Sequence, residues 1–301
     1  MARILVIRLG ALGDFVQSFA PFAAIRAHHA HDEVDLLTQR AFAGLGTHAP
    51  WFDHVHVDAR PGWHDLPALL AQRAFLRSYD FVYDLQTSRR STRYFYLSGM
   101  KAWSGIGRGA VAEHDSPQRR AMHNGGRQRD QLRHAGLDAG LPVPDLSWLA
   151  AGGPVVEGPY GVLVPGASAR HPAKRWPVER YAALATRMWA RGIRPVIVGG
   201  RGESPLAAVI RHACPDALDL TGATSLLELG GVIARAACAV GNDTGPMHMA
   251  AALGVPSTVL FSAVSNPALS APVGRYPGQV RVIYVRDLAT LRVDRVAATL
   301  A

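Results

Sequence analysis

The segment from residue 240 to 256, VGNDTGPMHMAAALGVP, has the composition of a strand, a tight turn and a helix start. Its Asn-Asp-Thr triplet supplies capping residues, its first Pro suits the first helical turn, and Gly-Val-Pro ends the helix. Such a start carries unpaired N–H groups and a partial positive charge, which attract phosphate. Thr244 and Gly245 allow close backbone approach, and His248 can reach the same anion. Asp243 either binds sugar or base hydroxyls or caps the helix, and the alternative for the whole segment is a well-capped helix with a surface His248.

A second turn with chemical potential follows the first apolar run of the chain. Ile4–Ile7 predicts a buried parallel strand, and the next residues, RLGALG, predict a glycine-bearing turn. Asp14 follows at the start of a helix with an apolar face, where the residues alone favour a role as helix cap. The glycines are spaced GxxG rather than GxGxxG, so no dinucleotide site is predicted here.

Polar and cationic side chains follow two further strand-like runs. Gln86, Arg89 and Arg90 come after the run at 81–85, at the strand end where α/β sheets place ligand contacts. They are candidates for binding an anionic ligand, and the alternative for each arginine is a solvated helix start. Lys174, one of only two lysines, lies in a loop after a later apolar run. It is a candidate counter-charge for phosphate, or else an ordinary surface lysine.

The elements that position these residues alternate along the chain. Short apolar runs alternate with helical patterns, which predicts an α/β fold with parallel sheets covered by helices on both faces. A Pro/Gly-rich stretch divides the chain into domains 1–150 and 151–301, and the last helix could pack back on the first domain. Segments 105–109 and 123–129 are predicted to be loops. The predicted strands are 4–7, 34–38, 54–57, 81–85, 161–164, 195–198, 217–220, 238–240, 257–261 and 280–285, and the predicted helices include 66–79, 130–137, 177–191, 225–236 and one from 290.

Composition narrows the class of protein. The 301 residues are 49% hydrophobic, which allows a large core, and no apolar run is long enough for a membrane span. Without a signal-peptide pattern, a cytoplasmic location is expected. The net charge of +9 favours an anionic partner, but no nucleic-acid-binding motif is present, so nucleic acid is not expected. The two cysteines show no metal-ligand spacing and are expected to be buried free thiols.

Three segments together carry a resemblance to a known family. They are RILVIRLGALGD at 3–14, PGAS at 165–168 followed by PAKRWP at 172–177, and NDTGPMHMAAALG at 242–254. In this order and over most of the chain, they resemble the motifs of glycosyltransferase family 9, the ADP-heptose:lipopolysaccharide heptosyltransferases. The resemblance implies the GT-B architecture: two Rossmann-like domains with an interdomain cleft, the first binding the acceptor and the second the nucleotide-sugar.

The resemblance also implies a role for each matching residue. Asp14 corresponds to the proposed catalytic base, and Lys174 to the cation that stabilises the leaving diphosphate. Arg8, in the same turn as Asp14, is expected with Gln86, Arg89 and Arg90 to bind the acceptor. The expected donor-binding residues are Ser168 and Lys174 near the phosphates, Glu203 at the ribose (or as a helix N-terminal acid), Thr224 at the base, and Asp243, Thr244, Gly245 and His248 of the C-terminal motif.

The implied activity is inverting transfer of heptose from ADP-heptose to a lipopolysaccharide core acceptor. No metal or cofactor is expected, because the chain lacks an Asp-x-Asp motif and has a cationic loop instead. An anionic, lipid-linked acceptor and the +9 charge suggest peripheral contact with the inner face of the cytoplasmic membrane. The alternatives are another nucleotide-sugar or acceptor, a non-catalytic nucleotide-binding protein on the same scaffold, and a nicotinamide-dependent dehydrogenase, which the missing GxGxxG disfavours.

Overall fold

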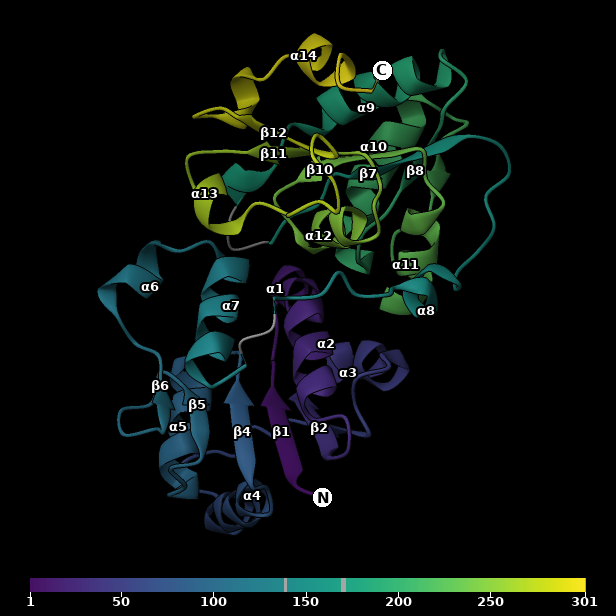
Figure 1. Cartoon of the computed structure of the whole chain (residues 1–301). Coiled ribbons are helices and arrows are strands. Elements are labelled where there is room, and N and C mark those ends of the chain that lie inside the picture. Colours follow the sequence, from purple (N-terminus) through teal and green to yellow (C-terminus); the bar gives the residue numbers. More distant parts are fainter. Residues whose placement is uncertain (138–139, 169–171, 301) are drawn as a thin grey trace. The chain divides into compact units, whose positions relative to one another are not determined.

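The chain forms two compact α/β units, Met1–Pro144 and Asp145–Ala301. Figure 1 shows the labelled helices and strands of both units in a computed structural model. The structure describes residues 1–137, 140–168 and 172–300. The described helices are all too short or too polar to serve as membrane spans.

The division between the units lies slightly earlier than the boundary at residue 150 that the sequence predicted. The short helix α8 (Ser147–Ala150) belongs to the second unit because it packs on α11 (Leu226–Ala234). The fit is close: a Cβ atom on Gly230 would lie 2.4 Å from Cδ1 of Leu149. The segment expected to be a linker is therefore partly a packed helix.

The first unit is built on a six-stranded parallel sheet with the strand order β3-β2-β1-β4-β5-β6. The four strands predicted from apolar runs are present, and their parallel pairing agrees with the predicted α/β class. Two short strands, β5 and β6, were not predicted because their few residues give no readable alternation. The bounds are β1 (Arg3–Ile7), β2 (Glu33–Thr38), β3 (His54–Val57), β4 (Phe81–Asp84), β5 (Trp103–Gly105) and β6 (Ala112–Glu113).

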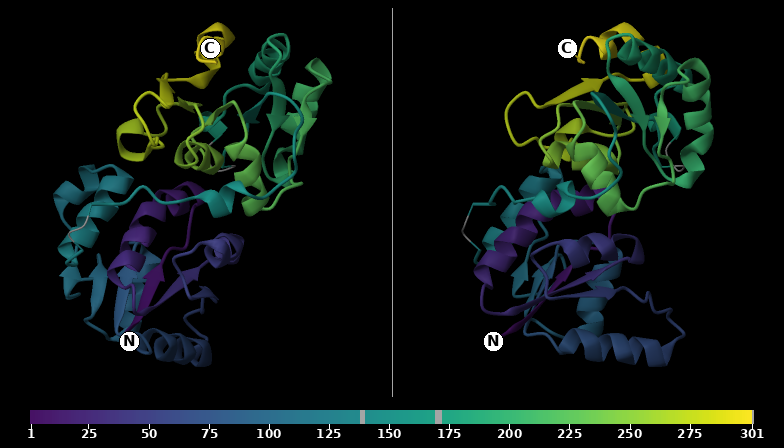
Figure 2. Two further views of the ribbon diagram at one scale, coloured as in Figure 1. Left: turned by 45° about the vertical axis from the view of Figure 1, so that its right-hand side comes forward. Right: turned by 90° about the vertical axis from the view of Figure 1, so that its right-hand side faces the viewer.

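Helices cover both faces of this sheet (Figure 2). Alternate β1 side chains, Leu5 and Ile7, share a core with Leu76 near the end of α4 and Phe95 of α5. The other face carries an aromatic cluster in which Phe15 stacks on Phe42 with ring centroids 5.4 Å apart. The helices are α1 (Leu12–Gln17), α2 (Phe19–His28), α3 (Arg40–His48), α4 (Leu66–Arg77), α5 (Arg89–Ser98), α6 (Pro117–Ala121) and α7 (Asn124–His134).

Helix α7 corrects the sequence analysis. Segment 123–129 was expected to be a loop because Asn-Gly-Gly is unfavourable inside a helix. In the structure these residues form the first turns of α7, and the His123 side chain accepts a hydrogen bond from the Gly125 N–H. The helix also packs on α1 and α2. Capping and tertiary contacts therefore outweigh the weak local preference.

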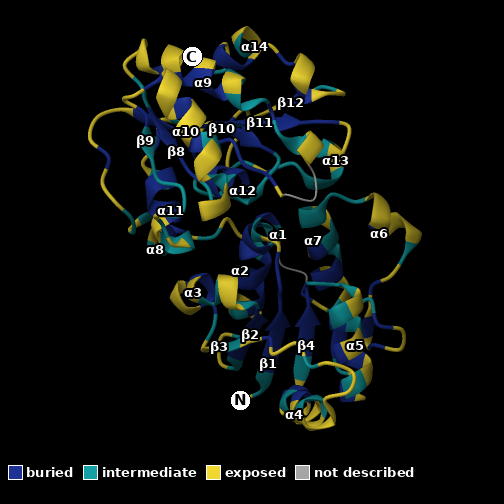
Figure 3. Cartoon of the chain, turned by 180° about the vertical axis from the view of Figure 1, so that it is seen from behind, coloured by how far each residue is buried: buried dark blue, intermediate teal, exposed yellow. Residues whose placement is uncertain are grey.

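The second unit repeats the plan with the order β12-β11-β10-β7-β8-β9, again all parallel. All six strands coincide with predicted runs. Figure 3 shows that the strands in the middle of each sheet are buried. The bounds are β7 (Tyr160–Val164), β8 (Arg194–Ile197), β9 (Leu218–Asp219), β10 (Cys238–Asn242), β11 (Ser257–Phe261) and β12 (Val280–Tyr284).

One face of the second sheet shares a core with α9, α10 and the last helix, α14. Arg187 of α9 pairs with Asp294 of α14 at 2.6 Å. In the part of the chain that the structure describes, the last helix therefore contacts its own unit. Helix α12 ends at Ala252, and Gly254, which follows the C-cap Leu253, has a positive φ of 86° and serves as the predicted helix stop. The other elements are η1 (Pro172–Lys174), α9 (Val178–Trp189), η2 (Arg201–Glu203), α10 (Ser204–Ala213), α12 (Gly245–Ala252), α13 (Pro267–Ser270), η3 (Leu288–Thr290) and α14 (Val293–Ala297).

Both sheets have the doubly wound order of a Rossmann fold, in which the connections run in opposite directions from two central strands. These strands are β1 and β4 in the first unit and β7 and β10 in the second. Ligands of doubly wound sheets bind outside the carboxyl ends of such strands. The loops after these four strands carry most of the residues singled out from the sequence.

Candidate active site

The loop after β10 leads into the predicted anion-binding helix start. Thr244 is the N-cap of α12 in an extended conformation, and its hydroxyl makes no capping hydrogen bond to a described residue. The helix start therefore offers backbone N–H groups that a side chain has not taken up. His248 is buried, so the alternative prediction of a surface histidine at this position is wrong. Gly245 is the first residue of the helix.

Asp243 does not cap α12. Its carboxylate accepts a hydrogen bond from Lys174 Nζ at 2.6 Å and another from the Ser265 hydroxyl at 2.8 Å. The Asp243 side chain is 7% exposed and that of Lys174 is 20% exposed. Lys174 is therefore held in place rather than projecting freely. Since an ammonium group has three N–H donors, Lys174 can keep this contact and still bind a phosphate oxygen.

Asn242 positions the loops of the candidate site, whereas the sequence predicted only a possible helix cap. Its fully buried amide oxygen accepts hydrogen bonds from the Trp176 N–H and the Tyr181 hydroxyl. Its Nδ2 donates to the carbonyl oxygens of Pro165 and Gly166. The amide thereby fixes the loop after β7 and the start of α9 to β10. A polar residue at the end of an apolar strand was the available signal.

Glu203 lies between the ends of β7 and β8. Its Oε2 accepts the Gly200 N–H at 2.7 Å, which makes it the helix N-terminal acid considered as an alternative to ribose binding. A Cβ atom on Gly166 would lie 1.6 Å from Glu203 Oε1, and one on Gly199 would lie 2.3 Å from Oε2. Both glycines are therefore required for the carboxylate to occupy this position.

The remaining predicted donor residues lie in nearby loops of the same unit. Thr224 is half-buried and immediately precedes Ser225, which caps α11. Ser168 is exposed in the loop after β7. The rest of that loop, 169–171, lies outside the described residues. The structure thus joins Lys174 and Asp243 directly, and it places Glu203 against Gly166, near the start of the loop after β7.

In the first unit, Asp14 is the third residue of α1 rather than its cap. The N-cap is Ala11, which has no side chain able to cap. Asp14 Oδ1 accepts a hydrogen bond from Asn124 Nδ2 at 2.7 Å and lies 3.6 Å from Arg8 Nη2. Its side chain is 46% exposed. Both described contacts use Oδ1, so Oδ2 is the oxygen available to a substrate.

Arg8 is buried beneath this carboxylate. Its Nη1 donates to the Leu85 carbonyl oxygen, and its Nη2 faces Asp14. Burial lowers the pKa of the Arg8 guanidinium, while the charges of Asp14 and Asp84 oppose that change. Arg8 is therefore positioned to orient Asp14, and little of its surface can reach an acceptor. Asn124 was missed because it lies in the segment predicted to be a loop.

The residues after β4 hold the turn that carries Asp14. Gln86 Oε1 accepts the N–H groups of Leu9 and Gly10 at 2.8 and 3.2 Å. Asp84, the last residue of β4, accepts the N–H groups of Gln86 and Thr87. Burial raises the pKa of the Asp84 carboxyl to about 6. The Gln86 side chain thus supports the β1–α1 turn, and contact with an acceptor remains a prediction.

The two predicted arginines of α5 differ in environment. Arg89 is exposed at the first position of the helix. Arg90 pairs with the buried Asp58 at 3.0 Å, so part of its charge is compensated. Arg90 also borders a groove of about 520 Å³, whose other lining residues include Arg60, Trp63 and Arg93.

A buried arginine, Arg119, was not predicted. Its Nη2 donates to the Thr87 hydroxyl at 2.7 Å, and its Nε donates to His114 Nδ1 at 3.1 Å. Burial, together with the nearby positive charge of Arg127, lowers the pKa of Arg119 to about 10. The pKa of Arg8 is also lowered in part by Arg127. Arg8 and Arg119 thus both lie close enough to Arg127 for the charges to interact.

The comparison with known families decides between the possible classes of protein. The sequence profile described as glycosyltransferase family 9 (heptosyltransferase) matches residues 110–293, more than half of the chain. The chain belongs to glycosyltransferase family 9. This confirms the predicted family and identifies the chain as a glycosyltransferase, and it leaves no role for a nicotinamide-dependent dehydrogenase.

Individual relatives of this family 9 chain cover it to different extents. Lipopolysaccharide core heptosyltransferase OpsX of Haemophilus influenzae is 24% identical over 92% of the chain and 83% of its own length. Lipopolysaccharide heptosyltransferase 1 of Pseudomonas aeruginosa is 27% identical over 91% and 82%. Lipooligosaccharide heptosyltransferase 2 of H. influenzae is 35% identical, but the match spans 37% of the chain and only 34% of that relative.

Solved structures share the fold of the family 9 chain. E. coli heptosyltransferase WaaC with ADP has a TM-score of 0.80 at 20% identity, covering 98% of both chains. E. coli ADP-heptose lps heptosyltransferase II has a TM-score of 0.75 at 22% identity, covering 99% of this chain and 97% of the other. These similarities confirm the predicted GT-B class with two Rossmann-like α/β units.

Proposed function

We propose that this family 9 chain is an inverting heptosyltransferase that moves heptose from ADP-heptose to a lipopolysaccharide core acceptor. One observation carries the proposal: relatives that match nine-tenths of the chain are lipopolysaccharide heptosyltransferases. The E. coli structure solved with ADP supports ADP as the nucleotide. The first unit would bind the acceptor and the second the donor.

In the proposed reaction, Asp14 is the general base. As the acceptor oxygen attacks the anomeric carbon, its proton passes to Asp14 Oδ2, and the bond from that carbon to the distal phosphate oxygen of ADP breaks. Asn124 and Arg8 both contact Oδ1, which fixes the direction of the carboxylate. A carboxylate can act here because the hydroxyl becomes acidic only as the new bond forms.

The leaving ADP carries the negative charge that develops in the transition state. Lys174 and the start of α12 at Thr244 and Gly245 are the proposed stabilising groups. The contact with Asp243 keeps Lys174 ordered before the donor arrives, which reduces the cost of organising the site. Around the nucleoside, Glu203 is proposed to bind the ribose hydroxyls. Thr224 is proposed to contact the base, with Ser168 and His248 near the phosphates.

An anionic acceptor fits the charge of the first unit. Arg119, with the partly buried Arg127, supplies positive charge beside the loop after β4. Arg89 is exposed there, and Gln86 and Arg90 complete the proposed acceptor-binding set. Carboxylate or phosphate groups on the acceptor would relieve the repulsion among these guanidinium groups.

Direct assay tests the proposed substrate. The purified chain should transfer sugar from ADP-heptose to a heptose-deficient lipopolysaccharide core, detected by mass spectrometry, and should not use UDP-glucose or GDP-mannose. Transfer from one of those sugars instead would keep the family and overturn the heptose assignment. Activity should survive excess EDTA, because no metal or other cofactor is part of the proposal. A requirement for added Mg²⁺ would contradict the assigned role of Lys174 and α12.

Peripheral contact with the inner face of the cytoplasmic membrane is also proposed. Trp63, Leu66, Leu70 and Tyr96 are 57–68% exposed on α4, α5 and the preceding loop. Arg93 lies over the Trp63 ring at 4.8 Å, which combines a cation with an interfacial aromatic group. Apolar and cationic side chains together suit an anionic lipid surface.

Vesicle binding tests this contact. The chain should bind vesicles containing anionic lipid at low salt, and binding should weaken as salt screens the charges. Trp63→Ser should reduce binding more than Trp189→Ser, which alters a half-exposed tryptophan of the second unit and serves as the matched control. Equal effects of the two substitutions would contradict the proposed surface while leaving the transferase reaction unaffected.

A further inference from the structure

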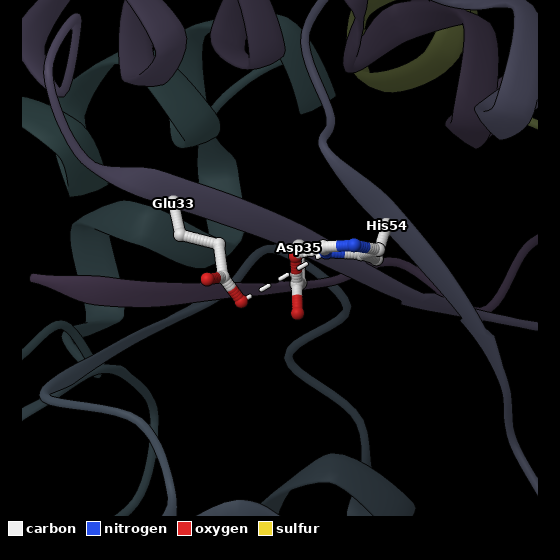
Figure 4. Close-up of side chains that lie close together, drawn as sticks. All are labelled: Glu33, Asp35 and His54. Carbon is white, nitrogen blue, oxygen red and sulfur yellow. Dashed lines mark hydrogen bonds and ion pairs between the residues drawn. The ribbon is translucent and has the colours of Figure 1, made fainter.

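A second cluster of ionisable side chains lies at the opposite end of the first sheet, where strands begin. Glu33 and Asp35 project from β2, and His54 from β3 (Figure 4). Asp35 and His54 are register partners of the two parallel strands. Glu33 and His54 begin their strands, whereas Asp14 and Gln86 follow strand ends. The cluster is therefore separate from the catalytic residues proposed above.

The geometry of the three side chains suits a metal ion. His54 Nδ1 lies 3.1 Å from Asp35 Oδ1 and 3.8 Å from Glu33 Oε1, and the ligand atoms all lie within 4.8 Å of one another. Tetrahedral Zn²⁺, with bonds of about 2.0–2.2 Å to nitrogen and oxygen, requires ligand atoms about 3.3 Å apart. Small side-chain shifts would therefore complete the site. We propose that Glu33, Asp35 and His54 bind one divalent transition-metal ion, with Zn²⁺ as the first candidate.

Asp35 has the supporting contacts expected of a metal-binding carboxylate. It is 1% exposed, and its second oxygen, Oδ2, accepts hydrogen bonds from the Tyr79 hydroxyl at 2.7 Å and His56 Nε2 at 3.0 Å. These contacts leave Oδ1 directed to His54. Partners of this kind orient a ligand and keep the carboxylate ionised. An imidazole with two carboxylates favours Zn²⁺, Ni²⁺ or Cu²⁺ over Mg²⁺ or Ca²⁺.

Arg3 competes with the metal for Glu33 Oε1 and places a positive charge near Asp35. Its Nε lies 3.1 Å from Glu33 Oε1, and its Nη2 lies 3.9 Å from Asp35 Oδ2. Metal binding must displace the first contact, and the guanidinium charge opposes a second cation nearby. The site should therefore bind moderately, and removal of the Arg3 charge should tighten it. A bound ion would link β2 to the edge strand β3 and stabilise the folded state.

Isothermal titration of the tag-free chain with Zn²⁺ tests the proposal. One equivalent should bind and raise the melting temperature. His54→Gln and Glu33→Gln should each weaken the affinity by more than about tenfold, and His56→Gln by about 10–100-fold, because partners of metal ligands have effects of that size. Arg3→Met should tighten binding. His48→Gln, at an exposed histidine of α3, is the matched control and should change nothing.

Two results would overturn the site. One is unchanged Zn²⁺ affinity in the His54→Gln variant, provided that its melting temperature without metal matches the wild type. The other is an Arg3→Met variant that binds no more tightly than the wild type. Because the inference does not depend on the proposed heptosyltransferase reaction, sugar transfer should be equal with and without Zn²⁺ at this site.

Discussion

Asp84 and Asp243 stand at corresponding places in the two units, at the end of β4 and just after β10. Asp243 has a strong cationic partner in Lys174 at 2.6 Å. Asp84 is 1% exposed, has no ion pair among the described residues, and has a pKa raised to about 6 by burial. The same strand order thus supports an acid with a direct ion pair in one unit and, among the described residues, an acid without one in the other.

The difference extends to the surrounding cations. In the second unit, Lys174 is ordered by its partner before a ligand binds. In the first, Arg119 and Arg8 have their pKa lowered by burial and by the nearby charge of Arg127. A group of neighbouring arginines is suited to an anionic acceptor, whereas a paired lysine is suited to stabilising a charge that grows during the reaction. Four substitutions test this contrast.

Asp14→Asn should have the largest effect. The substitution keeps the shape of the side chain and alters its contact with Asn124 at one oxygen only. We therefore expect a near-normal melting temperature and unchanged ADP binding. Loss of the base should lower kcat by about 10²–10⁴-fold. Asp115→Asn, at an acid outside the turn, is the control. Normal turnover by Asp14→Asn would require another base.

Lys174→Ala should lower kcat by about 10²–10³-fold, the range for loss of one transition-state electrostatic contact. It should also reduce the melting temperature, because Asp243 stays nearly buried without its cation. The double variant Lys174→Ala/Asp243→Asn should recover stability but not activity. Recovery of activity in the double variant would show that Asp243, rather than Lys174, governs the reaction.

Asp84→Asn tests the buried carboxyl of the first unit that has no ion pair among the described residues. Its pKa of about 6 exceeds the ordinary value of 3.8, so the folded state binds this proton more tightly than the unfolded state does. Protonation of Asp84 therefore stabilises the folded state at low pH, and this stabilisation is lost as the pH rises from about 4 to above 6. Between pH 4 and 7, the free energy of unfolding of the wild type should fall by ~2 kcal/mol relative to Asp84→Asn in urea titrations. Parallel pH profiles would contradict this account.

Arg119→Gln should have the smallest effect. Arg119 is buried, so it would act on the acceptor through its charge rather than through a direct hydrogen bond. Loss of about 1 kcal/mol of charge attraction should raise the KM for the acceptor by about fivefold. The KM for ADP-heptose should not change, because Arg119 belongs to the first unit. Arg133→Gln, at an exposed arginine of α7, is the control. A rise in the KM for the donor instead would reverse the assignment of the units.

Local patterns in the sequence were sufficient for much of the fold. Apolar runs located β1 and β7, and Gly254 located the end of α12, because strand burial and helix termination depend on neighbouring residues. The family motifs also led to the correct family. The start of α7 was predicted wrongly, since this helix is stabilised by the His123 cap and by packing on α1 and α2.

The sequence by itself determined the α/β alternation, the family and the identities of the candidate residues. Only the tertiary structure decided their partners. Asn124 reaches Asp14 across 110 positions, and Lys174 reaches Asp243 across 69. Such pairs depend on which strands lie side by side in the sheet, and no local pattern specifies that order. Whether a charge is free, paired or buried is therefore a property of the folded chain.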